Sequence, residues 1–246
     1  MQASDNTSWN TNAEFWDNAM GNDLNDYHRQ VVRPAIMEFL GNITGESILD
    51  IACGNGSFSA LLSRMGAKVT AIDYSDQLID IAKMRWKESH VEFLVCDATN
   101  EESILSLGEH RFSKAVSTMA LMDISDIKSM VKALSRVLKH NGLFVFATQH
   151  PCFVTLTDRY MTEHSYQGEA ITGQPVQHTY YHRSLQDLFS PLHIRPPHDH
   201  LSVKPARAQD SRVKDIHTVG GRHDNDALVG GKAVHLHKEL VQRLLS

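Results

Sequence analysis

A short glycine-rich segment, Asp50-Ile-Ala-Cys-Gly-Asn-Gly56, carries the residue types in this chain that are best suited to chemistry. Glycine permits a positive φ and lets a ligand approach the backbone closely, so Gly54 and Gly56 predict a tight loop. A helix that begins directly after such a loop offers free N–H groups and a partial positive charge. The carboxylate of Asp50 stands beside these donors. The combination suits a ligand with both a carboxylate and an ammonium group better than it suits a pyrophosphate.

Two further acids follow later apolar segments. Asp73 comes after the run 67–72, and Asp97 comes after the run 91–96. If these runs are parallel strands, their carboxyl ends meet at the edge of the sheet where α/β proteins bind ligands. An acid about 20 residues after a glycine loop is placed to bind the ribose hydroxyls of a nucleoside. Asp97 is placed to accept a hydrogen bond from an exocyclic amine such as adenine N6.

Alternating strands and helices have to position these side chains. Strands are predicted at 47–52, 67–72, 91–96, 112–118 and 143–148. Helices are predicted at 57–65, 75–87, 101–107 and 125–139, with Ser75 as an N-cap and Asn141-Gly142 ending the last helix. Nearly continuous apolar strands that alternate with helices indicate an α/β fold of the Rossmann-like, doubly wound type. Its sheet is mostly parallel, with helices on both faces.

The two ends of the chain differ from this core. Residues 9–40 are predicted to form two short helices, because Pro34 fits best near a helix start. Residues 151–182 are polar and aromatic, and a short helix is predicted at 184–189. The segment 190–226 is rich in proline and histidine and predicts no pair of strands, whereas 232–245 has a helical pattern.

Length and composition limit the classes of protein to consider. With 246 residues, 41% of them hydrophobic and 22% charged, the chain fits a globular protein with one domain, and no apolar run is long enough to cross a bilayer. The N-terminus lacks a signal-peptide pattern and the three cysteines lack metal-ligand spacing, so we expect a cytoplasmic location, free thiols and no metal. A net charge of −5 argues against general nucleic-acid binding.

The motifs resemble those of the class I S-adenosylmethionine-dependent methyltransferases that act on small molecules. The resemblance covers about residues 10–150, and it rests on the glycine loop, on Ala71-Ile-Asp73-Tyr-Ser75, on Val95-Cys-Asp97-Ala98 and on the strand exit 119–123. It implies S-adenosyl-L-methionine as cofactor, with the loop on the methionine moiety, Asp73 on the ribose and Asp97-Ala98 on the adenine. The cofactor-binding residues implied are Asp50, Ala52, Cys53, Gly54, Asn55, Gly56, Asp73, Tyr74, Asp97, Ala98, Met119 and Ala120.

The resemblance also implies a division of the chain within a single domain. A helical lid (1–40) precedes the cofactor-binding core (41–150), an acceptor-site insertion with its helix (151–189) and a divergent tail (190–246). Trp16, Tyr27 and Arg29 would then belong to the lid, with plain helix packing as the competing explanation for the aromatic residues.

Two features depart from the family pattern. Ala52 and Ser59 stand where stricter glycine motifs have glycine, which is a mild change because both residues are small. The family also closes its sheet with two further strands after a helix like 184–189, and the segment 190–246 does not have that pattern. This tail is either strongly divergent or the product of a shifted reading frame.

Methyl transfer from a sulfonium is an in-line displacement, which a protein can promote mainly by orientation and exclusion of water. A general base is needed only where the acceptor is protonated in its resting state. His150 is the first candidate for that base and His182 the second, with a hydrogen-bonding loop histidine as the alternative for each. Arg183 and Arg29 are either ligands for an anionic acceptor group or ordinary surface arginines.

The sequence therefore predicts an enzyme that transfers a methyl group from S-adenosylmethionine to an oxygen, nitrogen or carbon atom of a small molecule. One alternative is a degenerate cofactor-binding domain without catalysis, because the tail is irregular. The other is an NAD-dependent oxidoreductase, since Gly54-x-Gly56 with Ser59 partly matches a dinucleotide loop. Against the oxidoreductase, Asp50 would place a negative charge beside the pyrophosphate.

Overall fold

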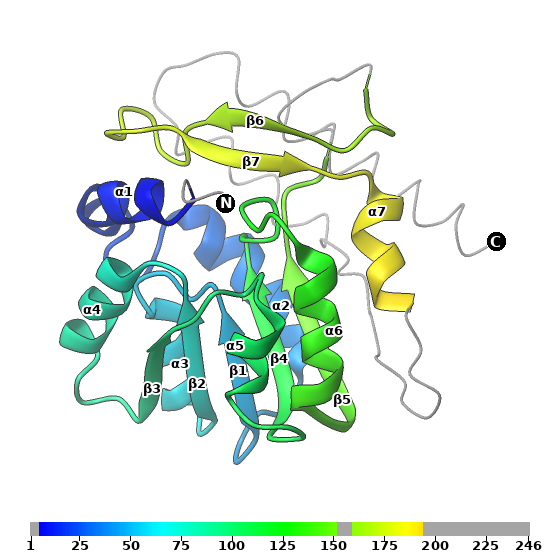
Figure 1. Ribbon diagram of the computed structural model, residues 1–246. Coiled ribbons are helices and arrows are strands. Elements are labelled where there is room, and N and C mark those ends of the chain that lie inside the picture. Colours follow the sequence, from blue (N-terminus) through cyan, green and yellow to red (C-terminus); the bar gives the residue numbers. More distant parts are fainter. Residues whose placement is uncertain (1–4, 152–158, 194–246) are drawn as a thin grey trace.

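A parallel five-stranded sheet forms the centre of the computed structural model, which describes residues 5–151 and 159–193 (Figure 1). The strand order is β3-β2-β1-β4-β5. The strands are β1 (Ser47–Ile51), β2 (Lys68–Asp73), β3 (Val91–Val95), β4 (Phe112–Thr118) and β5 (Leu138–Ala147). The chain winds outward from β1 in one direction and then from β4 in the other, so the topological switch point lies between these two strands. Ligands of open α/β sheets bind at that point.

Helices cover both faces of the sheet. One apolar cluster joins the sheet to α2 (Arg33–Leu40), α3 (Ser57–Arg64) and α4 (Asp76–Arg85). A second cluster, on the other face, joins it to α5 (Glu101–Leu105), α6 (Ile127–Val137) and α7 (Leu185–Phe189). The predicted α/β fold with two covered faces is therefore confirmed.

The helix signals in the sequence have direct counterparts in the structure. The hydroxyl of Ser75 accepts the N–H of Leu78 at 3.1 Å, which confirms Ser75 as the N-cap of α4. Pro34 lies in the first turn of α2, as its fixed φ predicts. The N-terminal region forms α1 (Asp5–Met20) and then a π-helical turn, η1 (His28–Val32), that leads into α2.

The prediction for residues 125–148 was wrong in its boundaries. Helix α6 ends at Val137, and β5 already begins at Leu138, which pairs with Phe112. The register then shifts, so that Lys114 pairs with Leu143. Asn141, at φ +57°, lies in the extra segment between these pairs. The Asn-Gly signal therefore marks an irregularity inside a strand and not the end of the helix.

A two-stranded antiparallel hairpin was not predicted. It consists of β6 (His164–Gly168) and β7 (His178–His182) and lies across the sheet at the end where α1 also lies (Figure 1). Helix α7 follows it, and a short 3-10 turn, η2 (Ser190–His193), ends the described chain. We call the hairpin β6–β7 the roof, because it covers the carboxyl ends of the strands.

Several predictions fall outside the described residues. The tail beyond residue 193, with the helix expected at 232–245, and Cys152 belong to this group. Within residues 5–151 and 159–193, no helix has the length and apolarity needed to cross a membrane.

Gly56 joins the glycine loop to the sheet and allows no side chain. It has φ +74°, and an added Cβ would lie 2.6 Å from Cε1 of Phe93 and 3.0 Å from Cβ of Ala82. Both neighbours belong to the apolar cluster behind the loop. The loop can therefore lie against β3 and α4 only if this residue is glycine.

The Gly56→Ala variant should lose about 2–4 kcal/mol of unfolding free energy, because overpacking adds to the strain of a positive φ. Urea unfolding measures the loss. Gly173→Ala is the matched control, since Gly173 has φ +85° but nothing within 4 Å of an added Cβ. A Gly56 variant no less stable than this control would contradict the packing argument.

Candidate functional site

The carboxyl ends of the five strands bring most of the predicted residues into one row. Backbone hydrogen bonds join the loops that follow neighbouring strands. The N–H of Cys53 donates to the carbonyl of Ile72, the N–H of Cys96 to the carbonyl of Asp73, and the N–H of Met119 to the carbonyl of Ala147. The row therefore follows the strand order, with Asp97 at one end, then Asp73, the glycine loop, Met119 and finally the segment after β5. Asp50, Asp73 and Asp97 therefore lie at the same edge of the sheet, as the sequence predicts.

The glycine loop is a tight turn with left-handed residues. Ala52 and Gly54 both have φ +57°, and the N–H of Gly56 donates to the carbonyl of Cys53 at 3.1 Å. Ala52 thus adopts a conformation that costs a non-glycine residue of order 1 kcal/mol or more. This strain explains why stricter motifs have glycine at this position. The residue type of Ala52 does not reveal it.

Asp73 holds this loop in place. Its Oδ2 accepts the N–H of Gly54 at 2.8 Å, and its Oδ1 accepts the N–H of Ser75 at 2.9 Å. Burial raises the pKa of Asp73, while its hydrogen bonds to the N–H groups of Ser75, Gly54 and Tyr74 lower it. An ionised carboxylate has about four lone-pair directions, so capacity for further donors remains.

Asp50 lies at the end of β1 and is 1% exposed. Its Oδ2 accepts the hydroxyl of Ser59 at 2.6 Å, and no described residue donates to its buried Oδ1. Burial raises the pKa of Asp50 to about 7; the Ser59 hydrogen bond lowers it, and the charge of Asp73 raises it further. Ser59, a departure from the glycine pattern, therefore provides a specific partner for this acid.

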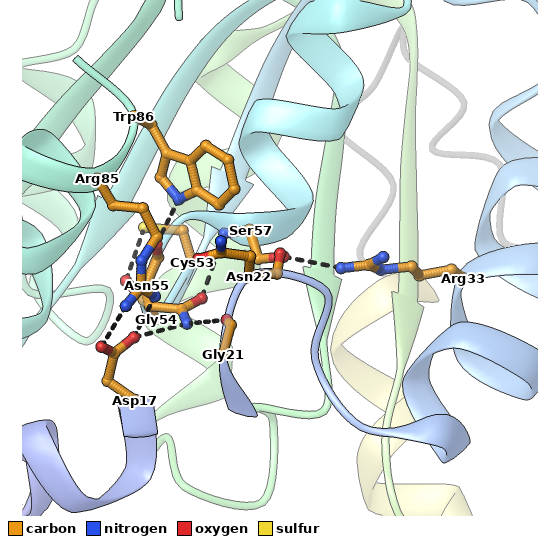
Figure 2. A network of polar contacts seen from close by, with 10 residues as sticks. All are labelled: Asp17, Gly21, Asn22, Arg33, Cys53, Gly54, Asn55, Ser57, Arg85 and Trp86. Carbon is orange, nitrogen blue, oxygen red and sulfur yellow. Dashed lines mark hydrogen bonds and ion pairs between the residues drawn. The ribbon is translucent and has the colours of Figure 1, made fainter. Parts of the chain in front are cut away.

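Asn55 turns its side chain toward the N-terminal segment. Its Nδ2 donates to Asp17 at 2.8 Å and to the carbonyl of Gly21 at 3.0 Å (Figure 2). Its carbonyl accepts the indole N–H of Trp86 at 2.8 Å. Because that carbonyl belongs to the backbone, it is the backbone N–H of Asn55 that is left to serve a ligand at the loop.

The residues expected around an adenine lie at the ends of β2 and β3. Asp97 forms a local turn, because its Oδ1 accepts the N–H and the hydroxyl of Thr99 at 2.8 and 2.7 Å. Ala98 is buried, and Tyr74 is 37% exposed. An exposed aromatic side chain beside a carboxylate at a strand exit is compatible with a bound base.

Met119 and Ala120 follow β4 at the switch point. Met119 is left-handed with φ +54°, and Ala120 is buried. His150 lies three positions after the end of β5, at the same edge of the sheet, and is half-buried. The predicted sulfonium floor and the first candidate base therefore follow neighbouring strands.

His182 lies in the roof, apart from this row. Its Nε2 lies 2.9 Å from the carbonyl oxygen of Tyr160, and its ring stacks on that of His164 with centroids 4.6 Å apart. It is 5% exposed. These contacts match the structural alternative stated for His182 more closely than a catalytic role.

The roof also carries two tyrosines that the sequence did not single out. Tyr166 and Tyr180 pair across the strands with ring centroids 5.5 Å apart. Burial and the nearby charge of Asp123 raise the pKa of both phenols, so both are protonated at neutral pH. Asp123 belongs to the exit of β4, which places the tyrosines near the same edge.

Arg183 anchors the roof and does not face solvent. Its guanidinium donates to the carbonyls of Leu121, Ile124 and Ser125 at 3.1, 2.7 and 2.6 Å. The expectation of a surface arginine was therefore wrong, and its hydrogen bonds to carbonyls argue against an anion-binding role. Arg29 is about half exposed and forms an ion pair with Asp26.

The two described cysteines are not reactive thiols. Cys53 and Cys96 are free thiols, and burial raises both pKa values, that of Cys96 to about 11. In the part of the chain that the structure describes, no three His, Cys, Asp or Glu side chains are grouped to hold a metal ion.

Comparison with known proteins identifies the domain. Residues 49–146 match the family model described as "Methyltransferase domain". A ubiquinone biosynthesis O-methyltransferase of Alkalilimnicola ehrlichii is 33% identical over 113 residues, which are 46% of this chain and 45% of that protein. A demethylmenaquinone methyltransferase of Clavibacter sepedonicus is 27% identical over 222 residues, covering 76% of this chain and 86% of the relative. The chain thus spans less than half of the first relative's length.

Solved structures confirm the fold. An S-adenosylmethionine-dependent methyltransferase from Mesorhizobium loti superposes with a TM-score of 0.51 and 22% identity, over 65% of this chain and 77% of that one. One from Methanosarcina mazei gives a TM-score of 0.53 at 23% identity, over 65% and 82% of the two chains. With its glycine loop and its row of strand-end acids, the segment 49–146 matches a methyltransferase domain, and its fold is that of the S-adenosylmethionine-dependent methyltransferases above.

Proposed function

We propose that this protein transfers the methyl group of S-adenosylmethionine to a small-molecule acceptor. The observation that carries the proposal is the buried Oδ1 of Asp50, to which no described residue donates, beside a glycine loop anchored by Asp73. A buried acceptor oxygen without a donor is costly unless a ligand supplies one. The ammonium of the methionine moiety is such a donor, and a pyrophosphate is not, which disfavours the dehydrogenase alternative.

The donor set fits the rest of the cofactor as well. Backbone N–H groups at the start of α3 suit the methionine carboxylate, because Gly56 caps that helix in a left-handed conformation. The spare lone pairs of Asp73 suit the ribose hydroxyls, and Asp97-Ala98 with Tyr74 suits adenine. Met119 and Ala120 would line the space below the sulfonium. When bound, the cofactor supplies an activated methyl group.

The chain's own part in the reaction is to orient the acceptor and exclude water. The roof lies above the strand ends, so an acceptor bound there would be shielded from solvent (Figure 1). His150, at the end of the row, is the residue we propose as base where the acceptor holds a proton. His182 becomes a positioning residue of the roof, because its imidazole is bound to Tyr160 and stacked on His164.

The acceptor class follows from two features. The roof presents Tyr166 and Tyr180, and the floor presents Met119 and Met122, which together suit a flat, partly apolar molecule. The relatives are named for ubiquinone biosynthesis and for demethylmenaquinone. We therefore propose a small ring compound of the quinone-precursor type, methylated at oxygen or carbon.

The proposal also includes the setting of the reaction. The free thiols of Cys53 and Cys96 fit a reducing compartment such as the cytoplasm. The net charge of −5 fits a small-molecule acceptor better than a nucleic acid.

Calorimetry with S-adenosylmethionine tests binding, and a screen of phenolic and quinone-type acceptors with a labelled methyl donor tests transfer. We expect binding and label transfer to at least one ring compound. Binding without transfer to any acceptor would favour the non-catalytic alternative. A wild-type protein that fails to bind the cofactor would refute the proposal.

Asp73→Asn should weaken the binding of S-adenosylhomocysteine by roughly 100-fold, because two charge-assisted hydrogen bonds to the ribose become neutral ones. Isothermal titration measures the change. An analogue without both ribose hydroxyls is the control ligand, and it should lose far less affinity, because for this ligand only the hydrogen bonds of Asp73 to the loop and to Ser75 are weakened. Equal losses for both ligands would mean that Asp73 acts on the loop alone.

Asp50→Asn should change the pH dependence of stability. The folded carboxyl has a pKa of about 7, above its value of about 4 when unfolded, so the folded state binds the extra proton between pH 4 and 7. The contribution of Asp50 to stability therefore falls as pH rises through this window, by up to about 4 kcal/mol. Relative to the wild type, the variant should gain stability from pH 4 to pH 8 in urea unfolding. An unchanged difference would contradict the raised pKa.

The same group should make cofactor affinity depend on pH. Only the ionised form of Asp50 attracts an ammonium, so wild-type affinity for S-adenosylmethionine should rise roughly tenfold between pH 5.5 and 7. Affinity of Asp50→Asn should be weaker and nearly flat over this range. If the affinity of the wild type varied as little with pH as that of the variant, Asp50 would not be the group that binds the ammonium.

A further inference from the structure

Asp17 is a buried acid on α1, and it contacts two elements of the cofactor domain at once. It is 7% exposed. Its Oδ1 accepts the side-chain amide of Asn55 in the glycine loop at 2.8 Å, and both of its oxygens accept the guanidinium of Arg85 at the end of α4 (Figure 2). One carboxylate thus joins α1, the loop and α4.

Asn55 is the member of this network that belongs to the loop. Its Nδ2 has two acceptors, Asp17 and the carbonyl of Gly21, while its Oδ1 accepts the N–H of Ser57 at 3.3 Å. Its carbonyl is held by Trp86. The side chain is 1% exposed. Because all these groups are bonded, the conformation of the loop depends on residues outside the loop.

Helix α1 lies directly on the same loop. An added Cβ at Gly54 would lie 3.1 Å from Cη2 of Trp16, one residue before Asp17. The hydroxyl of Ser75, at the exit of β2, donates to Oδ1 of Asn10 at 2.5 Å. Helix α1 therefore contacts the loops after β1 and after β2, which carry proposed cofactor contacts.

The charges in this network reinforce its hydrogen bonds. The Asp17 side chain is 10% exposed and that of Arg85 23%, so solvent screens this pair less than the surface ion pairs of the protein. A bidentate pair of this kind fixes the carboxylate, and the carboxylate in turn orients the amide of Asn55. None of these three side chains has to touch a ligand to influence the loop.

We propose that Asp17 is a positioning residue for the cofactor. It acts through Asn55, whose anchored side chain sets the backbone N–H groups of the glycine loop, and Arg85 holds Asp17 in the orientation this requires. The inference rests on the proposed function, because it concerns the affinity of the loop for S-adenosylmethionine and its product. It assigns a role in cofactor affinity to a helix outside the segment 49–146 that matches the family.

The test is a double-mutant cycle on the dissociation constant of S-adenosylhomocysteine, measured well below the melting temperature of each variant. Asp17→Asn and Asn55→Ala should each weaken binding by roughly tenfold, or about 1.4 kcal/mol. The double variant should bind no more than about twofold weaker than Asn55→Ala alone, because both changes remove the same bond. A purely structural role would lower the melting temperature without this non-additive effect on affinity.

Glu101→Gln is the matched control. It removes an ion pair with Lys132 that joins two helices away from the loop, so it should leave the dissociation constant unchanged. Should Asn55→Ala fail to fold, Arg85→Gln replaces it, because Arg85 is partly exposed and its loss leaves Asn55 bonded to Asp17. In a cycle with Asp17→Asn it should weaken binding by roughly threefold, again without adding.

The outcomes separate this inference from the proposed function. If the wild type does not bind S-adenosylhomocysteine or S-adenosylmethionine, both fail. If the wild type binds and Asp17→Asn stays within twofold of it, only the positioning role is refuted. Additive losses in the cycle, near 100-fold for Asp17→Asn with Asn55→Ala, would show that Asp17 does not act through Asn55 and would also refute it.

Discussion

The carboxylate of Asp73 is the interaction on which the rest of the site depends. It accepts one N–H from the exit of β1 and another from the exit of β2, so a single side chain joins the two loops at the centre of the sheet edge. Backbone donors cannot rotate away as side chains can, and charge-assisted bonds of this kind are strong. The glycine loop is thus set by the protein itself, which reduces the ordering that a ligand has to impose.

The same arrangement is costly for the fold. Asp50 and Asp73 are both buried, each has a raised pKa, and the charge of Asp73 contributes to the shift at Asp50. Buried acids with raised pKa values are a common mark of functional sites, so the two acids are best explained by recognition. Ser59 reduces the cost, since its hydroxyl bonds the oxygen of Asp50 that faces α3. A serine in place of glycine is therefore an adaptation to a buried acid, and a glycine could not provide this bond.

The local features of the site could be predicted from the sequence, and the distant ones could not. Strand ends and acids were found because apolar runs and the spacing after Gly54 are local signals. Asn12 and Asp17 were missed, and the role of Arg183 was mispredicted, because their partners are far away in sequence. Asn12 and Arg183 also bind mainly backbone groups, which any residue can supply. The hairpin was missed because the buried positions of β7 hold histidine, tyrosine and histidine. These residue types do not form the apolar alternation by which a strand is predicted from sequence.

The roof is held by contacts that do not involve the residues proposed to bind the cofactor. At one end, Asn12 of α1 exchanges two hydrogen bonds with the backbone of Val176, and His178 stacks on Trp9 with centroids 3.9 Å apart. Burial lowers the pKa of His178 to about 4, so this contact stays uncharged at neutral pH.

At the other end of the roof, the N–H of Tyr181 donates to the carbonyl of Met122 at 2.7 Å. Arg183 donates to three backbone carbonyls of the segment 121–125. Such anchors depend on backbone groups and tolerate changes in the side chains between them. The inner face of the hairpin can therefore vary with the acceptor while the loops around Asp50 and Asp73 stay as they are. Under the proposed function, this separation would let the acceptor side of the site change without changing the cofactor side.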